Sequence, residues 1–187
     1  MRKNSVKHLT VVALLIAMGV VIPMIMPRIT IGPASFTLAS HVPLFIAMFF
    51  SPGVAIAVAL GTAFGFFLTA PFIIALRALS HLVFAILGSV YLQKKPEIVL
   101  DNKKFQVYNF VIAIIHTVCE IAVVAIFFLS GQGVTPNNFG ILLLIMGLGG
   151  VVHSLIDYNI AYFIAKPLSN IFEIPVFAKA KEKSKLK

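Results

Sequence analysis

Residues 105–129 read FQVYNFVIAIIHTVCEIAVVAIFFL, an apolar run that holds one acidic residue, Glu120, and no lysine or arginine. The run is longer than the ~20 residues that an α-helix needs to cross the ~30 Å hydrocarbon core of a bilayer. The rest of the chain has the same character, because 60% of its 187 residues are hydrophobic and only 11% are charged. A water-soluble domain carries about 25% charged residues. The sequence therefore predicts an all-α integral membrane protein.

Glycine, proline and charged residues divide the chain into six apolar segments, which predict six transmembrane helices. Their approximate bounds are His8–Met26, Ser35–Phe50, Val54–Leu68, Pro71–Leu92, Phe105–Leu129 and Phe139–Ala165. The second and third segments are short for a span, so we expect them to be tilted among shielding neighbours or partly re-entrant. The first segment lacks a small-residue cleavage site and is interpreted as a retained helix. Residues 1–187 are thus expected to form a single transmembrane domain.

The positive charges predict the orientation of these helices. The chain has 15 lysines and arginines against 6 acidic residues, a net charge of +9. With six spans, all the basic residues except Arg28 and Arg77 fall on one side, which places both termini in the cytoplasm. The basic tail, 179–187, is expected to be solvated at the lipid surface. Because the cations flank apolar runs, they do not indicate a nucleic-acid partner.

Ionisable side chains inside the apolar runs are the candidate functional residues, since such groups are costly at bilayer depth. They form three pairs with i, i+4 spacing, namely Arg77 with His81, His116 with Glu120, and His153 with Asp157. This spacing places both members of a pair on one face of a helix. The sequence therefore predicts that the fourth, fifth and sixth helices turn these faces towards a shared polar pocket.

Arg77 suits a carboxylate ligand, because its planar guanidinium stays charged and offers a fork of donors. A structural ion pair with Glu120 or Asp157 is the alternative for this arginine. Glu120 is expected to hold Arg77 or a histidine in place, and Asp157 to be structural.

His81 and His153 lie near mid-span and are better ligand candidates than His116, although each could instead bond one helix to another. The histidines and acids could in principle bind a metal ion. No HExxH or CxxC spacing accompanies them, so we expect no metal and no cofactor. The chain also lacks a Walker motif, so ATP hydrolysis by that route is excluded.

Small residues at four-residue spacing indicate close helix contacts. Ala13 and Ala17 make such a pair in the first segment, and Gly61 and Gly65 in the third. A chain of this size with six predicted helices and this alanine pair resembles the S components, the substrate-binding subunits, of energy-coupling factor (ECF) transporters. Residues 31–53, IGPASFTLASHVPLFIAMFFSPG, look like the corresponding region of that family, and the resemblance covers most of residues 5–170.

The resemblance implies a high-affinity receptor for a vitamin in the cell membrane. Energy would come from a transmembrane coupling protein and two ATPases, with Ala13 and Ala17 at the coupling-protein interface. Substrate would bind near the outer side. The substrate-binding residues expected here are Arg77, His81, His153, Glu120, Asn137, Asn138 and Phe36, the last as a stacking surface for a ring.

The pattern most resembles the niacin-specific branch of that family, with pantothenate as the second choice. One cation in the outer part of the fourth helix suits a small carboxylate vitamin, and the absence of tryptophan disfavours thiamine or riboflavin. Three alternatives stay open: another vitamin-specific S component, a small integral-membrane histidine-dependent enzyme acting on lipid, and a structural or assembly protein.

Overall fold

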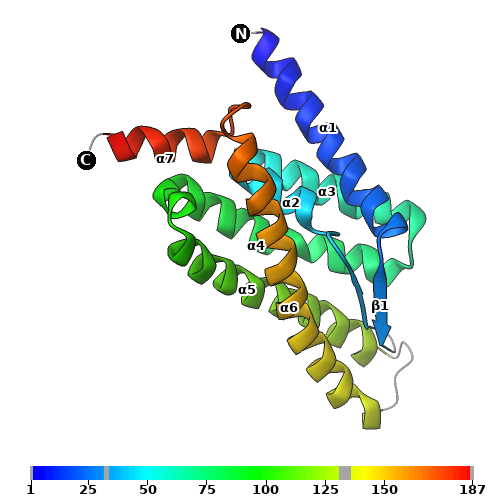
Figure 1. Ribbon diagram of the computed structural model, residues 1–187. Helices are drawn as coiled ribbons and strands as arrows, with labels where there is room; N and C mark the ends of the chain where they lie inside the picture. Colours follow the sequence, from blue (N-terminus) through cyan, green and yellow to red (C-terminus); the bar gives the residue numbers. More distant parts are fainter. Residues whose placement is uncertain (1, 32–33, 131–135, 186–187) are drawn as a thin grey trace.

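The computed structural model describes residues 2–31, 34–130 and 136–185, with the backbone alone for 2–5, 7, 8 and 136–138. This part of the chain is almost entirely helical (Figure 1). The helices are α1 Arg2–Ile25, α2 Val42–Phe50, α3 Pro52–Thr69, α4 Phe72–Lys94, the 3-10 helix η1 Pro96–Leu100, α5 Asn102–Leu129, α6 Pro136–Leu168 and α7 Pro175–Lys185. The strands β1 Arg28–Ile31 and β2 Ala34–Thr37 form an antiparallel hairpin.

Four of the helices are long and apolar enough to cross a membrane: α3, α4, α5 and residues Phe139–Leu168 of α6. Residues Leu9–Ile25 of α1 form a shorter apolar helix. The prediction of an all-α membrane protein is thereby confirmed. Local sequence sets where the helices start, since the Ser51 hydroxyl accepts the Val54 N–H at the start of α3 and the Asp101 carboxylate accepts the Lys103 and Lys104 N–H groups at the start of α5.

The second predicted helix, Ser35–Phe50, is wrong in its first half. Residues 34–37 form β2, which pairs with β1 so that Thr37 lies opposite Arg28. Ala39 then has a positive φ of 64°, which a right-handed helix cannot accommodate. Helix α2 begins only at Val42, where Pro43 fits the first turn. The chain between β2 and α2 is therefore non-helical.

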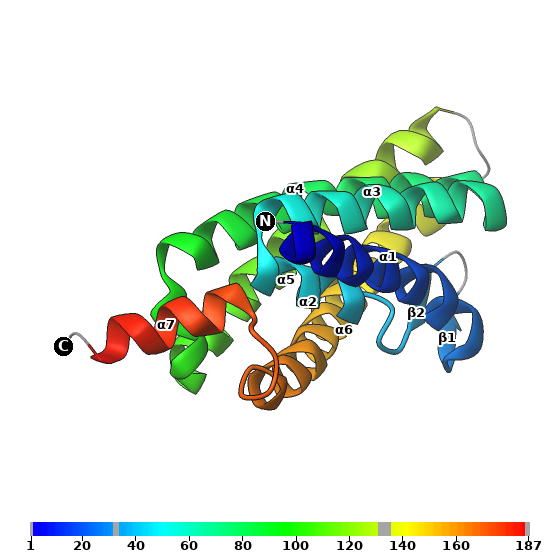
Figure 2. The ribbon, with the colours of Figure 1, turned by 90° about the horizontal axis from the view of Figure 1, so that it is seen from above.

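Helix α2 lies at the centre of the bundle. All of its residues are buried, and it contacts α1, α3, α4, α6 and α7. A helix that is apolar on every side is stable only when neighbours surround it. Viewed from above, α1 passes over α2 and α3 (Figure 2).

Glycines allow α1 and α3 to approach each other closely. A Cβ atom on Gly61 would lie 2.5 Å from Ile16, and one on Gly19 would lie 2.5 Å from the Thr62 hydroxyl. Gly61 and Gly65 thus serve internal packing. Ala13 and Ala17, in contrast, are exposed on α1.

Aromatic rings fill the end of the bundle next to α7. Phe105 stacks on Tyr162 with 3.9 Å between ring centroids, and Phe45 stacks on Tyr158 at 4.1 Å. Helix α7 was not predicted: its lysines are mostly exposed, as expected for the basic tail, but it buries Phe177 with Val176 and Ala180 on its other face. Through this buried face, α7 packs against the rest of the protein.

Candidate functional site

Asp157 holds the non-helical turn that precedes α2. Its two carboxylate oxygens accept the N–H groups of Ala39 at 2.8 Å and of His41 at 2.9 Å. A carboxylate at a helix N-terminus is also favoured by the helix dipole. Asp157 is fully buried, and its contacts agree with the structural role expected of it. The turn that it fixes projects the His41 ring into the bundle.

A buried ion pair links α4 to α5. One terminal nitrogen of the Arg77 guanidinium donates to Glu120 Oε2 at 2.9 Å, and His81 Nε2 lies 3.0 Å from Glu120 Oε1. The ion pair considered as the alternative for Arg77 is therefore present. Burying such charges in an apolar bundle is costly, which is why they are candidates for function.

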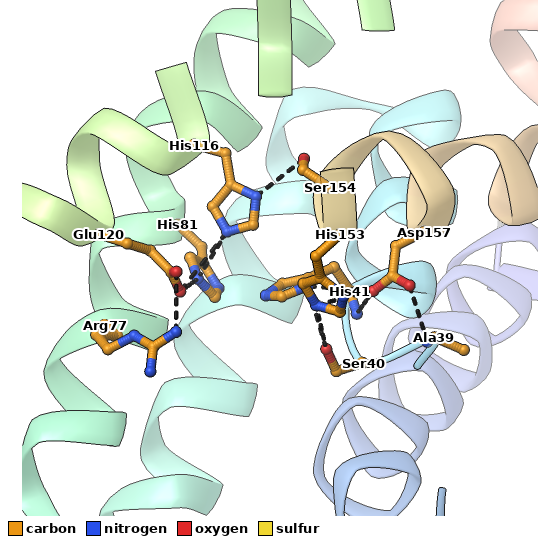
Figure 3. A network of polar contacts seen from close by, with 10 residues as sticks. All are labelled: Ala39, Ser40, His41, Arg77, His81, His116, Glu120, His153, Ser154 and Asp157. Carbon is orange, nitrogen blue, oxygen red and sulfur yellow. Dashed lines mark hydrogen bonds and ion pairs between the residues drawn. The ribbon is translucent and has the colours of Figure 1, made fainter. Parts of the chain in front are cut away.

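Four of the five histidines of the chain gather at this point (Figure 3). His116 Nδ1 lies 3.0 Å from the Ser154 hydroxyl, and His116 Nε2 lies 3.3 Å from His81 Nε2. The His41 ring stands between the others, with its centroid 4.8 Å from that of His81, 4.5 Å from that of His116 and 4.9 Å from that of His153. The polar faces of α4, α5 and α6 thus turn towards one another, as the sequence predicts.

A cavity of about 80 Å³ lies beside this cluster, between strand β2, the turn before α2 and helices α1 to α6. One water molecule needs about 10–15 Å³ in this measure, so the cavity suits a small molecule. Two of its lining residues, Arg77 and Thr62, hold unpartnered donors: Arg77 Nε and the Thr62 hydroxyl are buried and have no hydrogen-bond partner among the described residues. Buried polar groups are normally satisfied, so these two donors are candidates for hydrogen bonds to a ligand.

Most of the predicted site residues meet at this cavity. Arg77, His81, Glu120 and His153 all line it. Phe36 is not among the described lining residues; its ring packs behind the wall, 5.8 Å from the His153 ring. The side chains of Asn137 and Asn138 lie outside the described part of the chain.

His41, Ser40 and Thr62 also line the cavity, and the sequence interpretation missed them. His41 has no ionisable partner four residues away, so it did not appear among the helical pairs. The available signal was a polar Ser40-His41 pair inside an otherwise apolar stretch, because polar groups at that depth are costly.

Comparison with known proteins identifies the family of this chain. It is 46% identical over 187 residues to the Niacin transporter NiaX of Lactococcus lactis subsp. cremoris (strain MG1363), with 96% of this chain and 82% of that protein covered. The chain belongs to the niacin-type S-component family. No protein-family model and no solved structure matches it.

Its family and its four helices of membrane-spanning length identify this S component as a multi-pass protein of the cell membrane. The resemblance stated from the sequence is confirmed. Membership in a transporter family also favours transport over the alternative of an enzyme that acts on lipid.

Proposed function

We propose that this S component binds niacin, as the nicotinate anion, and delivers it to an ECF-type importer. The observation that carries this proposal is Arg77, which lines a cavity suited to a small molecule and whose buried Nε has no hydrogen-bond partner among the described residues. Guanidinium donors match a carboxylate in charge and geometry. The 46% identity to a niacin transporter supports the same substrate.

The identity to a niacin transporter favours niacin, a single aromatic ring with one carboxylate, over the second choice, pantothenate. Phe66 and three imidazole rings on the wall offer apolar and aromatic surface to such a ring.

The rest of the proposal concerns topology and energy. Six spans are proposed, with α2 as the second and shortest, and both termini are cytoplasmic. The chain ends lie away from the hairpin in the ribbon (Figure 1), which supports a cavity that opens to the exterior. A coupling protein and two ATPases supply the energy, and the exposed Ala13 and Ala17 receive the coupling protein.

Calorimetry with nicotinate tests the binding site. Arg77→Lys keeps a positive charge but removes Nε–H and the planar fork, so we expect at least about a tenfold loss of affinity, corresponding to roughly 1.5 kcal/mol or more for a charged hydrogen bond. Arg28→Lys, at an exposed position on β1, is the matched control. Unchanged affinity for Arg77→Lys would remove Arg77 from the site, and absence of nicotinate binding to the wild-type chain would overturn the function.

Substitution on α1 tests the coupling surface. Ala13→Trp with Ala17→Trp adds bulk at exposed positions, so the solitary protein should still bind nicotinate while uptake by cells is lost. Phe163→Trp, on an exposed position of α6, controls for a new tryptophan at the surface of the bundle. Normal uptake by the double variant contradicts the assignment of these alanines.

A further inference from the structure

Three potential metal-binding atoms converge beside the cavity. His81 Nε2, His116 Nε2 and Glu120 Oε1 are separated from one another by 3.0, 3.3 and 3.7 Å. A tetrahedral zinc ion with bonds of about 2.0–2.1 Å holds its ligand atoms about 3.3 Å apart. The three protein atoms therefore have the spacing of three corners of a tetrahedral metal site.

Hydrogen bonds alone explain this convergence poorly. Each imidazole Nε2 carries at most one hydrogen, and His81 Nε2 faces both Glu120 and His116. If His81 donates to Glu120, His116 Nε2 either turns a lone pair towards that same hydrogen or donates its own hydrogen to Glu120 Oε1 across a long 3.7 Å contact. A single cation at the common point would satisfy all three atoms at once.

The outer hydrogen bonds are those of a metal site. Metal-binding histidines normally donate their other ring N–H to a carboxylate, a backbone carbonyl or water, and ligand carboxylates are hydrogen-bonded in turn. Here His116 Nδ1 meets the Ser154 hydroxyl, and the second oxygen of Glu120 accepts from Arg77.

His41 supplies a possible fourth ligand. Its Nδ1 lies 3.2 Å from Asp157 Oδ2, and its ring extends from Asp157 towards His81 (Figure 3). One potential metal-ligand atom from each of the four residues His41, His81, His116 and Glu120 lies within 4.8 Å of the others. Imidazole and carboxylate together suit zinc and its neighbours in the first transition row.

The charge of the site gives an independent reason for a cation. With neutral histidines, Arg77 contributes +1 and the two buried acids, Glu120 and Asp157, contribute −2, so the cluster carries −1. A buried site of that charge disfavours a carboxylate ligand. A divalent ion would change the sum to +1, and a bound monoanion would then neutralise it.

We propose that His81, His116 and Glu120, with His41 on the fourth side, bind one divalent transition-metal ion of the zinc class. Because His41, His81 and Glu120 also line the cavity, a substrate carboxylate can enter the coordination sphere of this ion. This proposal departs from the sequence expectation that the chain binds no metal. The ligands of the proposed ion come from α4, α5 and the turn before α2, so no short spacing motif in the sequence could indicate them.

Metal content tests the site without reference to any substrate. The starting variant carries His8→Ala and Cys119→Ser, which remove the histidine and the cysteine that lie outside the cluster, and it is purified without a histidine tag. After dialysis against Zn²⁺ or Co²⁺, we expect about one ion per chain and the intense visible bands of tetrahedral Co²⁺. Either substitution in the starting variant, His116→Ala or Glu120→Gln, should abolish both the bound ion and the Co²⁺ bands. A monodisperse starting variant that retains neither metal overturns the proposal.

Ser154→Ala provides a variant that keeps every ligand. Loss of an outer partner lowers metal affinity about 10–100-fold, and we expect a fall in that range. Ser89→Ala is the matched control, because that buried hydroxyl bonds only to the backbone of its own helix. Equal zinc affinities for Ser154→Ala and the starting variant contradict the role of His116 as a ligand.

Nicotinate calorimetry with zinc-loaded and chelator-treated protein separates this inference from the proposed function. We expect zinc to raise nicotinate affinity more than tenfold. Stoichiometric zinc without nicotinate binding would refute the niacin assignment and leave the metal site intact. Nicotinate binding to protein that holds no metal in either preparation would refute the metal site and leave the niacin assignment intact.

Discussion

The two ends of the helix bundle are built from different kinds of ring. Next to α7, phenylalanines and tyrosines stack, and their hydroxyls are paired: Tyr108 with Tyr158 at 2.9 Å, and Tyr162 with the Val99 carbonyl at 2.9 Å. Next to the hairpin, imidazoles and charged groups surround a cavity, and Arg77 Nε has no partner among the described residues. One end is packed for stability, whereas the other keeps polar groups available for a ligand.

The comparison shows how a small membrane protein can carry a costly site. Dense packing near α7 stabilises α2, α5 and α6, because a protein interior at crystal-like density becomes less stable when any group is removed from it. The same helices then extend towards the hairpin and hold His116, Glu120 and Asp157 in place. We expect substitutions at the two ends to separate stability from binding.

The largest effect is expected at the aromatic end. Phe105→Ala removes a fully buried ring that stacks on Tyr162, and it should lower the free energy of unfolding by about 3–5 kcal/mol. Denaturation in mixed micelles measures this, with Phe163→Ala as an exposed control that should stay within about 0.5 kcal/mol. Nicotinate affinity of the folded fraction should be unchanged. A loss of affinity as large as that of Arg77→Lys would mean that the two ends are not independent.

Asp157→Asn should have an intermediate effect that reaches both properties. The charged acceptor of two backbone N–H groups is lost, which should cost about 2 kcal/mol of stability. Nicotinate affinity should also fall, because the turn that positions His41 is released. Asp101→Asn is the control, since asparagine caps a helix as well as aspartate does. Wild-type affinity in Asp157→Asn would show that this turn does not position a binding residue.

The smallest effects give the sharpest contrast between the ends. Tyr108→Phe deletes a satisfied hydroxyl near α7 and should cost about 1 kcal/mol of stability with no change in binding. Thr62→Val deletes the buried, unpartnered hydroxyl of a residue that lines the cavity, so stability should be unchanged or slightly raised while nicotinate affinity falls. Denaturation in mixed micelles measures the stability of both variants, and calorimetry measures their nicotinate affinity. If Thr62→Val destabilised the chain as much as Tyr108→Phe, its hydroxyl would be a structural group.

The long helices were predictable from the sequence because lipid imposes a simple length rule. Helices α3 to α6 begin and end within a few residues of the predicted segments. The i, i+4 pairs also identified the polar faces of α4, α5 and α6, since helix geometry alone brings such pairs together. These features depend only on local periodicity.

The missed features depend on contacts between distant segments. Ala39 adopts a positive φ because Asp157, on α6, binds the turn, and alanine gives no local sign of that conformation. His41 consequently looked like part of a helix. In α7 the lysines conceal a buried face formed by Val176, Phe177 and Ala180. Only the docked position of that segment reveals it.

The hairpin also sets how deeply the molecule sits in the bilayer. Within the described residues its sheet has two strands, so each strand leaves one edge of N–H and C=O groups outside the ladder. Hydrocarbon offers no partner to such an edge, while water does. The β1 strand, exposed along its whole length, must therefore stand in the aqueous phase or among lipid headgroups. This requirement anchors the polar end at the membrane boundary and keeps the cavity within reach of dissolved solutes.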